Sequence, residues 1–152
     1  MDTDRADQTR SCEGEPLDTS TTGVEHRAVP ASADRLPALR CVLADWATRV
    51  GLSADSVEAL GLASYEAMAN VVEHAYTDGE GELDLTAVLL PAENRVRVTV
   101  SDRGAWTTPP AQSDVRKGRG LPLIHHLAEE AEVIAVADGT MVRMWWSIPA
   151  AG

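Results

Sequence analysis

The chain has 152 residues, 44% of them hydrophobic and 24% charged, as expected for one globular domain and not for a collagen-like or disordered chain. Its formal net charge is -11, so a phosphate backbone would be repelled and we expect no direct nucleic-acid partner. No apolar run approaches the roughly 18 residues of a membrane-spanning helix, and the polar start lacks the pattern of a secretion signal. We therefore expect a cytoplasmic protein with no membrane partner.

The first 23 residues are rich in Asp, Glu, Ser, Thr and Gly and have almost nothing to bury. Such a composition cannot offset the entropy lost on ordering, so residues 1–23 are predicted to be a disordered tail. Residues 24–149 are predicted to form one domain. Its first element is a short strand over residues 24–29, where apolar and polar side chains alternate until Pro30.

The first predicted helix runs from Ser32, a candidate cap, to Gly51, which ends it. Pro37 falls in its first turns, where a proline is tolerated. Cys41 lies among apolar residues of this helix. We expect it to pack as a small apolar side chain, without a disulfide, in a reducing compartment.

A second, longer helix is predicted from its cap Ser53 to about Tyr76. Apolar or small residues recur along it at helical spacing and are expected to pack on a sheet. They are Val57, Leu60, Ser64, Met68, Val71 and Ala75. The same spacing places Glu66, Asn70 and Glu73 together on another side of the helix.

The rest of the chain predicts a hairpin, a long polar loop, a third helix and a second hairpin. In chain order these are residues 83–90 with 95–101, residues 102–118, a helix beginning near 119–121, and residues 132–137 with 140–148. The Asp138-Gly139 pair is a strong hairpin turn signal, and a loop as long as 102–118 is usually functional. The order of elements predicts an α+β fold, a two-layer sandwich with helices on one face of a mostly antiparallel sheet.

The motif EAMANVVEHAY, which begins at Glu66, contains candidate ligands for a phosphate-bound metal ion. Magnesium prefers oxygen ligands and keeps several waters, so the amide oxygen of Asn70 together with triphosphate oxygens is a sufficient set. Glu66 lies one helical turn earlier and is our candidate general base. Taken alone, such a pair is more often two solvated helix residues.

The motif SDRG, from Ser101, provides a carboxylate at the end of a strand. Because an ionised carboxylate only accepts hydrogen bonds, Asp102 suits the amino group of adenine. Gly104 has no side chain to block a flat ring.

The motif KGRGLPLI, from Lys117, places Gly118 and Gly120 around Arg119 immediately before a helix. Backbone donors at a helix N-terminus suit phosphate, and either Lys117 or Arg119 can add positive charge. Thr140, at the start of the last strand, has a hydroxyl that can bond the base directly or through water.

These motifs, in this order, resemble those of the GHKL ATPase superfamily (Bergerat fold), and more narrowly the anti-sigma-factor serine/threonine kinases. The resemblance covers about Val24 to Ile148. It implies that Glu66 is the catalytic base and Asn70 the magnesium ligand, with ATP and Mg2+ as cofactors. It also implies nucleotide contacts by Asp102, Gly104, Gly118, Gly120 and Thr140. The chain departs from the superfamily at Trp106, where a second glycine is common, and in its short loop before Gly118.

Two functions are consistent with this reading. The first is a protein kinase that transfers the γ-phosphate of ATP to a Ser/Thr of an anti-sigma-factor antagonist, and so regulates a bacterial sigma factor by partner switching. The second is an ATP-dependent regulatory module that binds a sigma factor or another regulator with little or no transfer. Glu66 favours the first, since binding alone needs no base. The resemblance also implies a possible homodimer.

Overall fold

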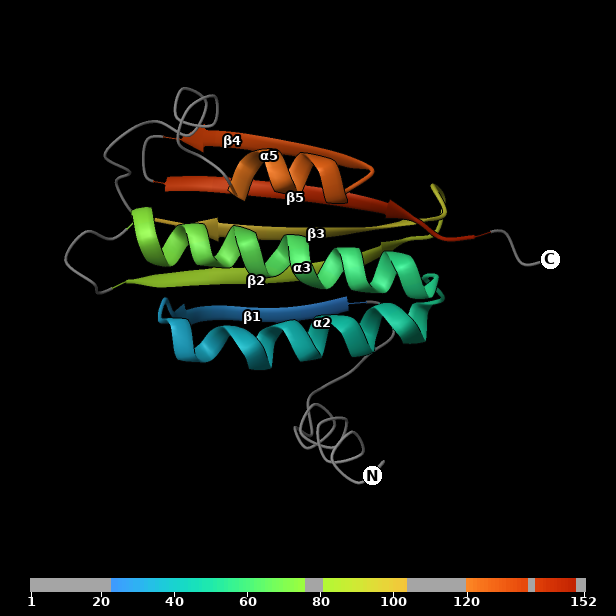
Figure 1. Ribbon diagram of the computed structural model, residues 1–152, viewed down its shortest axis with the longest axis horizontal. Coiled ribbons are helices and arrows are strands. Elements are labelled where there is room, and N and C mark those ends of the chain that lie inside the picture. The colour runs from blue at the N-terminus through green and yellow to red at the C-terminus, as the bar shows by residue number, and fades with distance from the viewer. Residues whose placement is uncertain (1–22, 76–80, 104–119, 137–138, 150–152) are drawn as a thin grey trace.

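The computed structural model of the protein describes residues 23–75, 81–103, 120–136 and 139–149 (Figure 1). Nearly all of the predicted tail and loop, residues 1–22 and 104–119, lie outside this part of the chain. In order, the elements are β1 (Gly23–Pro30), η1 (Ala33–Arg35), α2 (Leu36–Val50), α3 (Ala54–Asn70), η2 (Val71–Ala75), β2 (Glu82–Leu90), β3 (Arg95–Asp102), α5 (Gly120–Leu127), β4 (Glu130–Val136) and β5 (Gly139–Ser147).

The five strands form one antiparallel sheet in the order β1-β2-β3-β5-β4. The helices α2, α3 and α5 lie side by side over one face of it, as Figure 1 shows. This arrangement confirms the predicted α+β sandwich. Along β3 the burial alternates, with Val96, Val98 and Val100 buried toward the helices and the residues between them half-buried on the other face.

The first helix begins differently from its prediction. A short 3-10 turn, η1, precedes α2, and Pro37 occupies the first turn of α2 as expected. Ser32 occupies the N-cap position of η1 with an extended backbone, as predicted for a cap, but its hydroxyl donates to the Asp34 carboxylate and bonds no backbone N–H. The nearby Asp34 carboxylate competes with the backbone for the Ser32 hydroxyl, as is common for short polar side chains. Gly51 ends the helix in the left-handed conformation, φ 108°, as predicted.

The second helix confirms its cap and its buried stripe. The Ser53 hydroxyl accepts a hydrogen bond from the backbone N–H of Ser56 at 3.2 Å. Of the predicted stripe, Leu60, Ser64, Met68 and Val71 are buried and Val57 is half-buried, and the side chain of Ala75 lies outside the described part of the structure. The α-helix ends earlier than expected, at Asn70, because residues 71–75 continue it as the π-helical turn η2.

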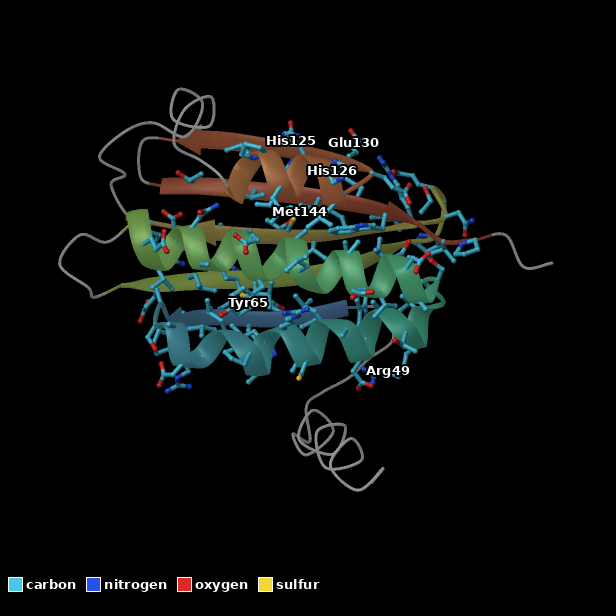
Figure 2. The ribbon with its side chains drawn as sticks, in the orientation of Figure 1. Arg49, Tyr65, His125, His126, Glu130 and Met144 are labelled. Carbon is cyan, nitrogen blue, oxygen red and sulfur yellow. The ribbon has the colours of Figure 1, made fainter. Side chains whose placement is uncertain are left out.

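Two neighbouring tryptophans on β5 point to opposite faces of the sheet, because successive side chains of a strand alternate. Trp146 belongs to the core between sheet and helices, and its indole N–H donates to the Leu127 carbonyl at 3.1 Å. Trp145 lies on the other face under the Arg95 guanidinium, 5.3 Å from the ring centre. Met144, labelled in Figure 2, is fully buried beneath the helices.

Cys41 in α2 is half-buried and disulfide-bonded, so the expectation of an unpaired cysteine is wrong. The other cysteine of the chain, Cys12, lies outside the described residues. Within the part of the chain that the structure describes, no helix is both long and apolar enough to cross a membrane.

Candidate functional site

Several predicted site residues lie at one end of the sandwich. The C-terminal end of α3, the C-terminal end of β3, the first residues of β5 and the start of α5 are all at the left in Figure 1. Antiparallel pairing explains part of this, because the end of β3 must meet the start of β5. The segments that contain Asn70, Asp102 and Thr140 therefore all lie at the same end of the fold.

Asn70 is the last residue of α3, where the α-helix passes into the π-helical turn η2. Such turns widen a helix by one residue and are frequent at functional sites. Asn70 is half-buried, and its side-chain nitrogen is fully buried without a hydrogen-bond partner in the structure. A buried amide nitrogen without a partner is costly, so a ligand that supplied one would be stabilised here. Glu66, one turn earlier, is also half-buried.

Asp102 and Thr140 are brought directly opposite each other. They are paired residues in the register of β3 and β5, and both are buried, with 7% and 4% of their surface exposed. The alternation along β3 points Asp102 toward the helical layer, like Val100 two residues earlier. A buried carboxylate and a buried hydroxyl therefore lie side by side at this end of the sheet, on the face that the helices cover.

Gly139 brings the start of β5 into very close contact with the end of β3. A Cβ atom at this position would lie 1.8 Å from the carbonyl oxygen of Asp102 and 2.8 Å from the Cα of Arg103. Its φ of +159° also disfavours any residue with a side chain. The sequence predicted Gly139 to be a turn residue. The structure shows in addition that the absence of a side chain there allows the backbone of residues 102 and 103 to pack against it.

A second carboxylate, Asp84 of β2, was not selected from the sequence. It lies on the sheet face away from the helices, between the fully buried Leu83 and Leu85, and only 12% of its side chain is exposed. It accepts hydrogen bonds from the Ala28 backbone N–H at 2.8 Å and from Arg103 Nη2 at 3.0 Å. In the LDLT alternation it reads as an ordinary solvent-facing residue, so only tertiary structure reveals its partners.

The phosphate side of the predicted site is described only in part. Gly120 is the first residue of α5, so the helix N-terminus expected to face phosphate is present at the same end as Asn70. Gly104, Gly118, Arg119 and Lys117 lie outside the described residues. Their assignments stay predictions.

The residues present fit a magnesium nucleotide. Among the described residues, no cluster of three or more His, Cys, Asp or Glu side chains is placed to hold a metal ion. An ion held here would depend on an amide oxygen and on the oxygens of its own ligand, which is chemistry that magnesium accepts. The side-chain nitrogen of Asn70, a buried donor without a partner, would suit a phosphate oxygen, which leaves the amide oxygen of the same side chain for the ion.

Comparison with known proteins identifies the family of this chain. A family model described as a histidine kinase-like ATPase domain matches residues 29–146. The serine-protein kinase RsbW of Bacillus thuringiensis is 28% identical over 120 residues, which cover 70% of this chain and 74% of that protein. The corresponding protein of Bacillus anthracis matches equally well.

Two solved structures share the fold. The RsbU and RsbW domains of Rv1364c from Mycobacterium tuberculosis match with a TM-score of 0.66 and 25% identity, over 82% of this chain and 32% of that one. The present chain thus spans about a third of that longer structure. The histidine kinase domain of the Erythrobacter litoralis EL346 blue-light activated histidine kinase matches over 80% of this chain and 66% of its own length, with a TM-score of 0.55. At 18% identity, that likeness shows the fold alone.

Proposed function

The chain belongs to the histidine kinase-like ATPase domain family, and from that premise we propose that it is an ATP-dependent serine/threonine protein kinase of the anti-sigma-factor type. The observation that carries the proposal is that polar groups from separate elements lie at one end of the sandwich. These are the unpartnered amide of Asn70 and the buried pair of Asp102 and Thr140. The similarity to serine-protein kinases named RsbW supports the kinase activity.

In the proposed complex, the two ends of the nucleotide are held by different elements. The Asp102 carboxylate accepts a hydrogen bond from the adenine amino group, and the Thr140 hydroxyl bonds the base directly or through water. The glycine at position 139 keeps both residues close together. Asn70 and the N-terminus of α5 act at the phosphate end, together with Gly118 and Arg119 or Lys117.

Magnesium, when bound, neutralises negative charge on the phosphates. The oxygen of Asn70 is the proposed protein ligand. Asn70 is the last residue of α3, so it is held at the end of a packed helix and needs little ordering on binding.

Glu66 is the proposed general base. Its carboxylate accepts the proton of a serine or threonine hydroxyl on the substrate protein while the hydroxyl oxygen bonds to the γ-phosphorus of ATP. The bond from that phosphorus to the β,γ-bridging oxygen breaks, and ADP leaves with the electron pair. Most of the rate enhancement is expected from positioning, because phosphoryl transfer asks little covalent chemistry of the protein.

The proposed substrate is an anti-sigma-factor antagonist, and the proposed second partner is a sigma factor in the cytoplasm. Phosphorylation would then decide which of the two the kinase binds. A homodimer is the proposed assembly, and light scattering of the purified chain tests it. The alternative function, an ATP-dependent binding module without transfer, predicts the same nucleotide site but no role for Glu66.

The experiment that tests the proposal compares Asn70→Ala and Glu66→Ala with the matched control Glu58→Ala, an exposed glutamate on the same helix. Nucleotide binding is measured by calorimetry with and without magnesium. Transfer is measured with radiolabelled ATP and a protein captured from the native cytoplasm. We expect Asn70→Ala to abolish magnesium-dependent binding and Glu66→Ala to bind ATP normally while transferring at least ~100-fold more slowly.

Glu58→Ala should behave as the wild type in both assays. Unchanged transfer by Glu66→Ala would refute the base assignment. A wild type that binds ATP and transfers nothing to any captured protein would favour the binding module. Absence of nucleotide binding by the wild type would refute both functions.

A further inference from the structure

The carboxylate of Asp84 lies on the back of the sheet, opposite the helices and the proposed nucleotide site. Its side chain is 12% exposed, and burying an ionised carboxylate to this extent requires compensating partners. Oδ1 accepts from the Ala28 N–H at 2.8 Å, and Oδ2 lies 3.0 Å from Arg103 Nη2 and 3.9 Å from Arg27 Nη1. Asp84 of β2 therefore ties together two segments that are distant in sequence, residues 27–28 and Arg103.

The first of these segments is an irregular part of β1. The pairing of β1 with β2 breaks between His26 and Val29, and Ala28 there has a left-handed φ of 56°. That conformation is unfavourable for alanine, and it frees the Ala28 N–H from the strand ladder. The hydrogen bond to Asp84 compensates for both losses, so this bulge is built around the carboxylate.

The second segment leads directly to the proposed adenine site. Arg103 follows Asp102 in the chain, and successive residues of a strand point to opposite faces. The Arg103 side chain accordingly reaches the back of the sheet, where Asp84 binds it, while the Asp102 carboxylate points to the helical face. Because one peptide unit joins the two residues, a change in the position of Arg103 also changes the position of Asp102.

The same peptide unit is held from the other side by β5. The Asp102 carbonyl and the Arg103 Cα pack against Gly139 so closely that no side chain fits there. With Gly139 on one flank and Asp84 behind, the backbone at residues 102 and 103 has little freedom to rotate. The Asp102 carboxylate is thereby fixed relative to Thr140, its partner across the strands.

From this geometry we infer that Asp84 and Arg103 form a positioning pair that sets the base specificity of the site by orienting the Asp102 carboxylate from behind the sheet. Neither residue touches the nucleotide. This inference rests on the proposed function, because it assigns the pair a role in reading adenine. The ligand class that it concerns is a purine nucleotide with an amino group at position 6.

Asp84→Asn and Arg103→Met test the inference, and Asp45→Asn is the matched control. Asparagine at position 84 retains an acceptor for the Ala28 N–H but loses the charge that binds Arg103. Asp45 pairs with Arg49 on the surface of α2, so its variant makes the same chemical change at a more exposed ion pair on another element. Affinities for ATP and for ITP, in which an oxo group replaces the 6-amino group, are measured by calorimetry, and unfolding is measured in urea.

We expect the wild type to bind ATP at least ~10-fold more tightly than ITP, because a well-placed carboxylate rewards the amino group and repels the oxo group. In Asp84→Asn and Arg103→Met, ATP affinity should fall ~5-fold to 20-fold while ITP affinity changes less than ~2-fold. The double variant should bind ATP about as tightly as the weaker-binding of the two single variants, because each single substitution already removes the same linkage. Arg103→Lys should restore part of the selectivity, and Asp45→Asn should match the wild type.

Three results would overturn the inference. Equal losses for ATP and ITP that follow the loss of stability would make the pair merely structural. Unchanged ATP affinity in both variants would show that Asp102 needs no support, although the proposed function would stand. A wild type that binds neither nucleotide would remove the proposed function and this inference together.

Discussion

Replacing Gly139 with alanine should separate the two strand ends that form the adenine side of the site. The new Cβ would lie 1.8 Å from the Asp102 carbonyl oxygen, far inside the roughly 3.5 Å of a favourable contact. Relief requires the backbone to move by more than an ångström, since both colliding groups are main chain. Overpacking of this kind costs about 1–3 kcal/mol, and the strained φ of +159° adds about 1–3 kcal/mol. We expect a loss of about 2–6 kcal/mol in the free energy of unfolding.

Urea unfolding followed by circular dichroism measures this loss, and ATP calorimetry under conditions where the variant is folded measures its effect on binding. Gly61→Ala is the matched control, because Gly61 lies in α3 and a Cβ there meets only the flexible Arg40 side chain, at 3.4 Å. That variant should be unchanged or more stable by up to about 1 kcal/mol. A Gly139→Ala protein within about 0.5 kcal/mol of the wild type, a range usual for surface changes, would refute the close approach of the strands.

Two further predictions concern buried polar atoms of the core. Trp146→Phe should lower the free energy of unfolding by about 2–4 kcal/mol, because it leaves the Leu127 carbonyl without its donor and opens a cavity. Trp46→Phe should lower the free energy of unfolding clearly less, because the Trp46 indole nitrogen is buried without a partner and its removal relieves that penalty. Equal losses of free energy for the two variants in urea would contradict this expectation. Ser64→Ala should raise the free energy of unfolding by about 1 kcal/mol, because the Ser64 hydroxyl is fully buried and unpaired and alanine favours the helix. Lower thermal stability of Ser64→Ala would show that the hydroxyl is satisfied in solution.

Much of the fold follows from local patterns in the sequence. Helical spacing identified the buried stripe of α3 because the same periodicity fixes which side chains face the sheet. Alternation of apolar and polar side chains identified the strand at residues 24–29 for the equivalent reason, and the structure has β1 there (Gly23–Pro30). Gly51 ended its helix where predicted, since the left-handed conformation there favours glycine strongly.

Features that depend on tertiary contacts were missed. The π-helical turn after Asn70 is only five residues long, so no residue pattern marks its start. The bulge at Ala28 has no glycine or asparagine to announce a left-handed residue, and it exists because Asp84 supplies a partner from another strand. Residue type alone predicted a cap hydrogen bond from Ser32, but the nearby Asp34 carboxylate takes its hydroxyl instead.

For the site, the motifs gave the correct order and ends of elements but not the supporting contacts. Asp102 and Thr140 were selected separately, and the structure pairs them across adjacent strands. The close approach of Gly139 to the backbone of residues 102 and 103, and the hydrogen bond from Arg103 to Asp84, depend on tertiary structure and could not be read from the motifs. The roles of Glu66 and Asn70 in binding and transfer stay predictions.

The central claim is that one adenine nucleotide is held between Asn70 and Asp102, and calorimetric titration of ATP with and without magnesium tests it most directly. The wild type should bind one ATP per chain, more tightly with magnesium. Asp102→Ala should weaken binding at least ~10-fold in both conditions, whereas Asn70→Ala should remove only the magnesium-dependent part. If both variants bind ATP as the wild type does, or if the wild type takes up no ATP, the two residues do not form a nucleotide site.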